Sequence, residues 1–129
     1  MEKKEQNKIT ETDDLKEIKK LYGEEFIAAK NKKIGNSFCE KALNLKKVIL
    51  SSNQRIGNKC CDYAENLKEF VAPKNKMIGF SFCNNAHKLE KVDLTSNVEN
   101  GPYCFTACNN IKYFSTNNDY LKTYITKTL

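Results

Sequence analysis

Tryptophan is absent from this chain of 129 residues, histidine occurs once and proline occurs twice. Long apolar runs are also missing, since no stretch approaches the roughly 18 consecutive apolar residues that span a bilayer. No apolar segment follows the Lys- and Glu-rich N-terminus, so the pattern of a secretory signal is not seen. We therefore expect no membrane partner and a cytoplasmic location, or the cell surface or secretion if the sequence is a trimmed one.

Charge of one sign is not concentrated in a block either. The formal net charge is +6, which favours acidic partners through long-range attraction but indicates nothing about the fold. Most lysines stand near Asp or Glu in the sequence. The length is that of one domain, and it suffices to bury a core without disulfides or a metal.

What the sequence does contain is an internal repeat. Ile-Gly begins at residues 34, 56 and 78 and Asn-Gly at residue 100, so each copy starts 22 residues after the last. Aligning the copies produces two apolar columns, which are Leu45, Leu67, Leu89 and Ile111, and Val48, Phe70, Val92 and Phe114. It also produces a polar column of Asn31, Asn53, Asn75 and Asn97, which Asp119 continues.

The pattern within each copy resembles the BspA-like leucine-rich repeats. A copy reads Ile-Gly, two small or aromatic apolar positions, Ala or Cys, and then Leu-x-x-Val-x-Leu. The fourth copy matches best, with Cys104-Phe105, Cys108, Ile111 and Phe114 at the family's spacing. The first and third copies swap the order of Phe and Cys, and the second has Cys60-Cys61 instead. The resemblance covers roughly residues 23 to 121, and it implies a solenoid that binds other macromolecules.

Leu-x-x-Val-x-Leu contains a short period-2 stretch, which is typical of a strand with one buried face. Val48 and Leu50 are expected to point inward, and segment 25–28 supplies one further strand. Together with the resemblance, this predicts an α/β leucine-rich-repeat solenoid. The predicted solenoid has about five short parallel strands in one curved sheet. Short helices or helical turns form its convex side, and helices cap its ends. The glycine of each copy is expected to serve a tight bend.

We divide the chain into a polar N-terminal extension over residues 1–11 and a single leucine-rich-repeat domain over 12–129. A repeat stack needs caps at both ends. Residues 12–23 are predicted as an N-terminal cap helix, because an N-cap residue precedes apolar residues at helical spacing. Residues 119–129 are predicted as the C-terminal cap, after repeats that start at 34, 56, 78 and 100.

The outward strand positions are the predicted contact surface for a partner. The first outward position alternates in charge from strand to strand, which favours neighbouring pairs, and an adjacent stripe of outward apolar residues is a candidate contact patch. A loop, the N-terminal arm or a second copy of the chain could also cover that stripe, so self-association is an alternative. The predicted partner-binding residues are Ile27, Lys47, Ile49, Glu69, Val71, Lys91, Asp93 and Tyr113.

The residues that could carry chemistry are interpreted as structural. Six cysteines fall in columns expected to be buried, and free Cys is among the most buried side chains. Cys104-x-x-x-Cys108 has no matching Cys or His pair downstream, so it is a poor zinc signal. Unpaired thiols fit a reducing intracellular setting. His87 is expected at the surface, and no nucleophile stands near it. The sequence therefore predicts no catalytic residue, no metal and no cofactor.

The sequence predicts a non-catalytic protein–protein interaction module, binding an acidic protein or a host enzyme. A stand-alone intracellular inhibitor or adaptor, such as a mobile-element protein that blocks a host defence, is the favoured form. Two alternatives stay open. One is a fragment of a surface adhesin that binds host protein, the role that the family resemblance implies. The other is a basic solenoid for RNA or DNA, built on Lys30, Asn31, Lys32, Lys33, Lys46, Lys47 and Arg55.

Overall fold

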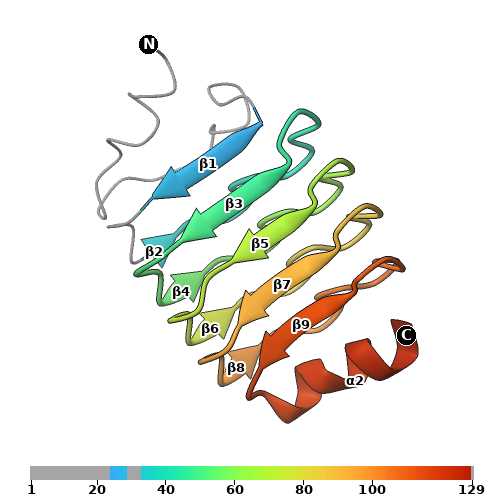
Figure 1. Cartoon of the computed structure of the whole chain (residues 1–129). Coiled ribbons are helices and arrows are strands. Elements are labelled where there is room, and N and C mark those ends of the chain that lie inside the picture. Colours follow the sequence, from blue (N-terminus) through green and yellow to red (C-terminus); the bar gives the residue numbers. More distant parts are fainter. Residues whose placement is uncertain (1–23, 29–32, 129) are drawn as a thin grey trace.

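The computed structural model describes residues 24–28 and 33–128, and side chains as far as residue 123. The described chain coils through about four turns, and corresponding strands of successive turns lie side by side (Figure 1). Every strand pairing is parallel and joins residues 22 apart, as Val48 and Phe70 are. The period seen in the sequence is therefore the length of one turn. The predicted N-terminal helix over 12–23 and the polar extension lie outside the described residues.

The five predicted parallel strands form one sheet, in the order β1-β3-β5-β7-β9. Their side chains alternate as expected, and in β3 the residues Val48 and Leu50 are buried while Lys47 and Ile49 are half-buried. Burial on one face and solvent on the other explains the period-2 pattern. The strands are β1 (Glu25–Ala28), β3 (Lys47–Leu50), β5 (Glu69–Val71), β7 (Lys91–Leu94) and β9 (Tyr113–Thr116).

A second parallel sheet forms where helices or helical turns were expected. Its order is β2-β4-β6-β8, and it lies behind the five-stranded sheet in Figure 1. Each of its strands is two residues long and includes the Ile or Asn that precedes a repeat glycine. The α/β prediction is therefore wrong for the repeats, which form a β-solenoid. The strands are β2 (Lys33–Ile34), β4 (Arg55–Ile56), β6 (Met77–Ile78) and β8 (Glu99–Asn100).

The remaining convex segments are hydrogen-bonded turns, and residues 33–118 contain no helix. Two positions in each turn have a left-handed backbone, and Ser37 and Lys41 illustrate them with φ of 57° and 58°. A left-handed residue interrupts a right-handed helix. Hydrogen bonds to the next turn stabilise this conformation, because Ser37 N–H donates to the Asn58 carbonyl and Lys41 N–H donates to that of Asp62, each at 2.8 Å. The convex wall is thus bonded between turns and not within a helix.

Gly57, Gly79 and Gly101 serve close approach between turns and not the tight bend that we expected. None of the described glycines has a positive φ. A Cβ at Gly79 would lie 2.7 Å from the Gly57 carbonyl carbon and 2.8 Å from the Asn58 nitrogen, which are backbone atoms of the preceding turn. Glycine is therefore required because the neighbouring backbone occupies the place of a side chain.

The described part of the polar column forms a buried ladder of side-chain amides. Asn53, Asn75 and Asn97 are fully buried. Asn75 Nδ2 donates to Asn53 Oδ1 and Asn97 Nδ2 donates to Asn75 Oδ1, each at 2.8 Å. Each Nδ2 also donates to a backbone carbonyl two residues ahead, as Asn75 does to Met77. Buried amides are tolerated because they are paired in this way. Asn31 lies outside the described residues.

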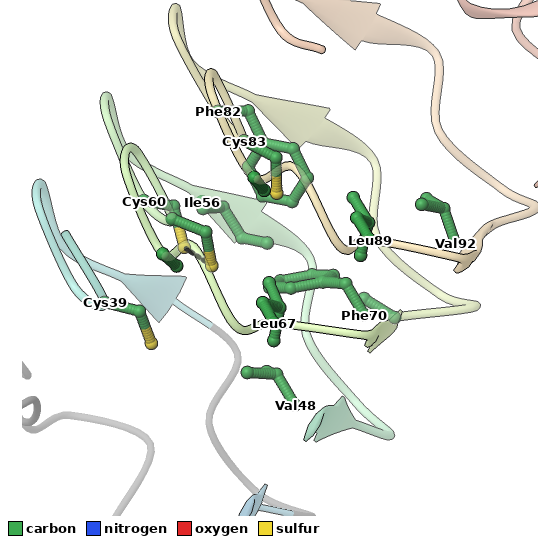
Figure 2. Close-up of a cluster of buried hydrophobic side chains, with 14 of the residues drawn as sticks. Cys39, Val48, Ile56, Cys60, Leu67, Phe70, Phe82, Cys83, Leu89 and Val92 are labelled. Carbon is green, nitrogen blue, oxygen red and sulfur yellow. Dashed lines mark hydrogen bonds between the residues drawn. The ribbon is translucent and has the colours of Figure 1, made fainter. Parts of the chain in front are cut away.

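The core fills the space between the two sheets and the convex turns. Figure 2 shows the column residues pointing into this space, with the cysteines beside the convex turns and Val48 and Phe70 beside the strands. Aromatic rings meet edge to face, and the centroids of Phe70 and Phe82 are 4.7 Å apart. In the second turn Cys60 stands where its neighbours carry Phe38 and Phe82, and the ring is supplied from the strand by Phe70. The second turn therefore carries its bulky ring on the strand and a small side chain at the convex wall.

The C-terminal helix α2 (Asp119–Thr128) packs against β9 and closes that end of the larger sheet (Figure 1). Its first turn is capped by Asn118, whose Oδ1 accepts the Tyr120 N–H at 2.9 Å. Leu121 is fully buried and covers the last turn of the core. Asn118 and not Asp119 continues the amide ladder, because Asn118 Nδ2 donates to Asn97 Oδ1.

Candidate functional site

The outward face of the five-stranded sheet brings the predicted contact residues into two aligned rows. Strand register sets Lys47 beside Glu69, Glu69 beside Lys91, and Lys91 beside Tyr113 in the first row. The second row consists of Ile27, Ile49, Val71, Asp93 and Ser115. All eight predicted residues therefore lie on one face, spread over all five strands.

The first row carries alternating charge between neighbouring strands. Lys47 Nζ lies 4.0 Å from Glu69 Oε2, and both side chains are about one-third exposed. An exposed pair of this kind contributes about 0–1 kcal/mol to stability. Its larger effect is on register, because a strand shifted by one residue would lose the pairing. Tyr113 ends the row with 70% of its surface exposed.

The second row changes character along the stack. Ile27 is 40% exposed, and Ile49 and Val71 are half-buried, so the first three strands present a continuous apolar stripe. Asp93 begins a polar end, because its Oδ1 accepts from the Thr95 hydroxyl at 2.6 Å and from the Thr95 N–H at 3.1 Å. The face is thus apolar toward β1 and hydrogen-bonded toward β9.

Thr95 and Ser115 belong to this face, although the sequence analysis did not select them. Thr95 Oγ1 lies 2.8 Å from Ser115 Oγ, which joins β7 to β9 beside Asp93. Ser115 could have been found by extending the second row by one further period of 22 residues. Thr95 carried no such signal, since it follows β7 and reaches the row only through its hydrogen bonds.

The proposed basic patch is divided between the two sheets. Lys33 and Arg55 are neighbours on β2 and β4 and are exposed. Lys46 and Lys47 stand at the start of β3, and each faces a carboxylate, with Lys46 Nζ 3.6 Å from Glu24 Oε1. Lys30, Asn31 and Lys32 lie outside the described residues. A nucleic-acid surface on this chain would therefore rest on the Lys33–Arg55 pair.

The cysteines are buried as expected, and all six are free thiols. Burial raises the pKa of the Cys104 thiol to about 11 and that of Cys108 to about 12. A thiol with a raised pKa stays protonated at neutral pH and is a poor nucleophile. Cys60 and Cys61 are neighbours in the sequence, and their sulfurs lie 3.8 Å apart. Both side chains pack in the core.

Among the described residues, no group of three or more His, Cys, Asp or Glu side chains is placed to hold a metal ion. His87 is exposed, as expected. One carboxylate is unusual, because Asp62 is buried on the convex wall and its Oδ1 has no partner within the described structure. Desolvation raises the pKa of Asp62 above its ordinary value of 3.8, and the nearby Glu40 raises it further, against the opposing charges of Lys59 and Lys41.

No helix among the described residues is long and apolar enough to cross a bilayer. In the comparison with protein families, the model of the BspA type leucine-rich repeat region matches residues 32–127, in six copies. No curated protein and no solved structure matches the chain.

Proposed function

The chain belongs to the BspA-type leucine-rich repeat family, and on that premise we propose that it binds a protein partner through the outward face of the five-stranded sheet. Repeat modules of this family generally bind proteins and are typically non-catalytic. The observation that carries the proposal is the apolar stripe of Ile27, Ile49 and Val71, aligned by strand register and partly exposed to solvent. Apolar side chains gathered on a folded surface favour a contact.

The arrangement around the stripe supports a partner with a defined chemistry. The row of Lys47, Glu69 and Lys91 borders the stripe with charges of alternating sign, and Tyr113 adds an exposed aromatic ring. Interfaces of this kind have an apolar centre and a polar rim, and Tyr is enriched among the residues that contribute most to binding. The partner we propose presents an apolar centre flanked by charged groups.

We further propose that the chain acts as an adaptor or inhibitor that works by occupying the surface of its partner. The buried free thiols are compatible with a reducing compartment, so the intracellular form of the proposal is retained, including a stand-alone inhibitor of a host enzyme. Binding to RNA or DNA stays an alternative based on Lys33 and Arg55. It predicts an affinity that falls steeply between about 50 and 200 mM salt.

The test uses two matched variants of the full chain. Ile49→Lys places a charge in the apolar stripe, while Leu43→Lys places the same charge at an exposed position in the loop that precedes β3. Partners captured by the wild-type chain are identified, produced in pure form and titrated calorimetrically against each variant. We expect Ile49→Lys to weaken binding by about tenfold or more, equivalent to about 1.4 kcal/mol, and Leu43→Lys to leave it unchanged. Equal affinity of the two variants would show that the outward face is not the binding surface.

A further inference from the structure

The smaller sheet ends in an unpaired edge. β8 is its last strand, and no described strand pairs with the outer side of β8. The chain leaves the solenoid at Asn118 and continues as α2 beside β9, the corresponding edge of the larger sheet (Figure 1). The two sheets therefore end differently, because a helix covers the edge of one, while no described element pairs with the edge of the other.

Hydrogen bonds between inner turns show what the open edge lacks. The Lys76 carbonyl accepts the N–H groups of Val98 and Glu99 at 2.9 and 3.0 Å, and the Ile78 carbonyl accepts that of Gly101 at 3.0 Å. One turn later the corresponding acceptors are the carbonyls of Val98 and Asn100. No described N–H group reaches either of them.

The reason lies in the start of α2. Tyr120 is 22 residues after Val98 and would continue the backbone pattern, but its N–H donates to Asn118 Oδ1 instead. On the convex side, it is an N–H donor that lacks its acceptor. Ser81 N–H donates to the Pro102 carbonyl at 2.9 Å, whereas the corresponding Tyr103 N–H meets no acceptor in the described structure. The carbonyls of Val98 and Asn100 and the N–H of Tyr103 thus face outward in the spacing that a further parallel strand would fill.

Apolar side chains surround the same edge. Val98 is 66% exposed and Tyr103 is 65% exposed. Beside them lies a hollow of about 500 Å³, lined by Val98, Gly101, Pro102 and Tyr120 among others. Exposed apolar groups next to unpaired backbone are the features by which sheet edges bind extended peptides.

The charge at the edge differs from that of the preceding strands. Lys33, Arg55, Met77 and Glu99 occupy equivalent outward positions on β2, β4, β6 and β8. Glu99 is exposed, and the position beside it on a further strand is empty within the described structure. Opposite charges at adjacent strand positions are favourable. A basic residue is therefore the best neighbour for Glu99.

We propose that the outer edge of β8 binds an extended peptide segment of a partner protein as a fifth parallel strand. A Lys or Arg of that peptide lies opposite Glu99. Backbone N–H groups of the peptide donate to the carbonyls of Val98 and Asn100, and a neighbouring apolar side chain of the peptide enters the hollow beside Tyr120. A second copy of the chain fits less well. Stacked in register it would also bring its β1 onto β9, where α2 already packs.

The probe is a synthetic peptide with the sequence of residues 53–58, Asn-Gln-Arg-Ile-Gly-Asn. It contains β4, a strand that pairs in this way within the chain and carries a basic residue at the required position. The peptide is titrated into the full chain and followed by amide chemical shifts. We expect saturable shifts confined to residues 98–103 and to Asn118 and Tyr120, which line the hollow. Methylating the backbone nitrogen of its Gln or Arg residue should weaken binding, because each methyl group removes an N–H that donates to the Val98 carbonyl.

Two charge-matched variants separate this edge from general electrostatics. We expect Glu99→Lys to weaken peptide binding by about tenfold or more, equivalent to about 1.4 kcal/mol, while Glu65→Lys, at an exposed loop position, leaves it unchanged. Ile49→Lys should also leave it unchanged, since Ile49 lies on the other sheet.

Three results would overturn the proposal. The first is a folded chain that shows no shifts at about 5 mM peptide, a concentration at which even weak millimolar binding is visible. The second is an equal loss of affinity in Glu99→Lys and Glu65→Lys. The third is concentration-dependent sedimentation of the chain alone that Glu99→Lys abolishes, because the edge would then be occupied by a second copy.

Discussion

Asn118 Nδ2 donates a hydrogen bond of 2.6 Å to Asn97 Oδ1. The same Nδ2 also lies 3.1 Å from Asn100 Oδ1, while Asn118 Oδ1 caps the first turn of α2. One side chain therefore ends the buried amide ladder and begins the capping helix. The stability of the ladder and that of the cap are coupled through this residue.

The variant Asn118→Asp tests this coupling. A carboxylate retains the oxygen that caps α2 but loses both Nδ2 donors, and it faces two amide oxygens instead. We expect the free energy of unfolding to fall by about 2 kcal/mol, as for a buried acceptor that loses its partner. Urea denaturation measures the change. Asn117→Asp is the control, because Asn117 is exposed and its described contact is made through its backbone. Equal losses in both variants would contradict the coupling.

Gly79→Ala tests the close approach of neighbouring turns. The added methyl group would meet backbone atoms of the preceding turn at 2.7 and 2.8 Å, so the turns must separate. We expect a loss of about 3 kcal/mol, at the upper end of the range for overpacking. Thermal and urea unfolding measure it, with the exposed Lys76→Ala of the same turn as control. If Gly79→Ala lost less unfolding free energy than Lys76→Ala, the neighbouring turns would accommodate the methyl group without cost.

The exchange of volume between Cys60 and Phe70 is tested by a double-mutant cycle. Phe70→Val leaves a cavity, with an expected loss of about 2 kcal/mol, and Cys60→Phe overfills the convex wall, with an expected loss of about 2 kcal/mol. The double variant recreates the pattern of the neighbouring turns, Phe38 with Val48 and Phe82 with Val92. We expect it to recover most of the loss, giving a coupling of more than about 1 kcal/mol. Additive losses would show that the two sites pack independently.

Asp62→Asn is expected to stabilise the protein at neutral pH. Burial raises the folded-state pKa of Asp62 above 3.8, so the ionised form is disfavoured in the folded state. A carboxyl of this kind reduces stability as the pH rises from 3.8 through its folded pKa, and the full cost remains at pH 7. We expect a gain of about 1 kcal/mol at pH 7, because the neutral amide of Asn does not carry the desolvation cost of a buried carboxylate.

The control for this prediction is the pH dependence itself. At about pH 3 the carboxyl is protonated in both states, because its unfolded pKa is close to 3.9. The difference in unfolding free energy between the two proteins should then disappear. A difference that is the same at both pH values would attribute the gain to packing and not to ionisation.

The larger sheet could be predicted because its strands carry a signal of their own. Val48 and Leu50 alternate with outward residues, and the 22-residue spacing assigns their neighbours without further information. The rows of the outward face follow from the same spacing. The function of that face could not be derived in this way, since register places side chains beside one another but does not identify a partner.

The smaller sheet was missed because two residues are too few to show alternation. Lys33 and Ile34 form such a strand, and the segment after them contains the Phe, Cys and Ala residues that also suit a short helix. The left-handed positions that exclude the helix are occupied by Ser, Lys, Tyr, Asn and Ala. Except for Asn, these types do not favour that backbone region. The conformation depends on hydrogen bonds between turns, which are tertiary contacts.

The constant 22-residue spacing has a consequence for how the molecule can change in length. Removing or duplicating one complete period leaves every remaining pairing between residues 22 apart. Each period adds one strand to both sheets, about 4.8 Å of stack. Recombination between copies would therefore lengthen or shorten the solenoid by whole turns. The length of both sheets would change, while the arrangement of side chains within each turn would stay constant.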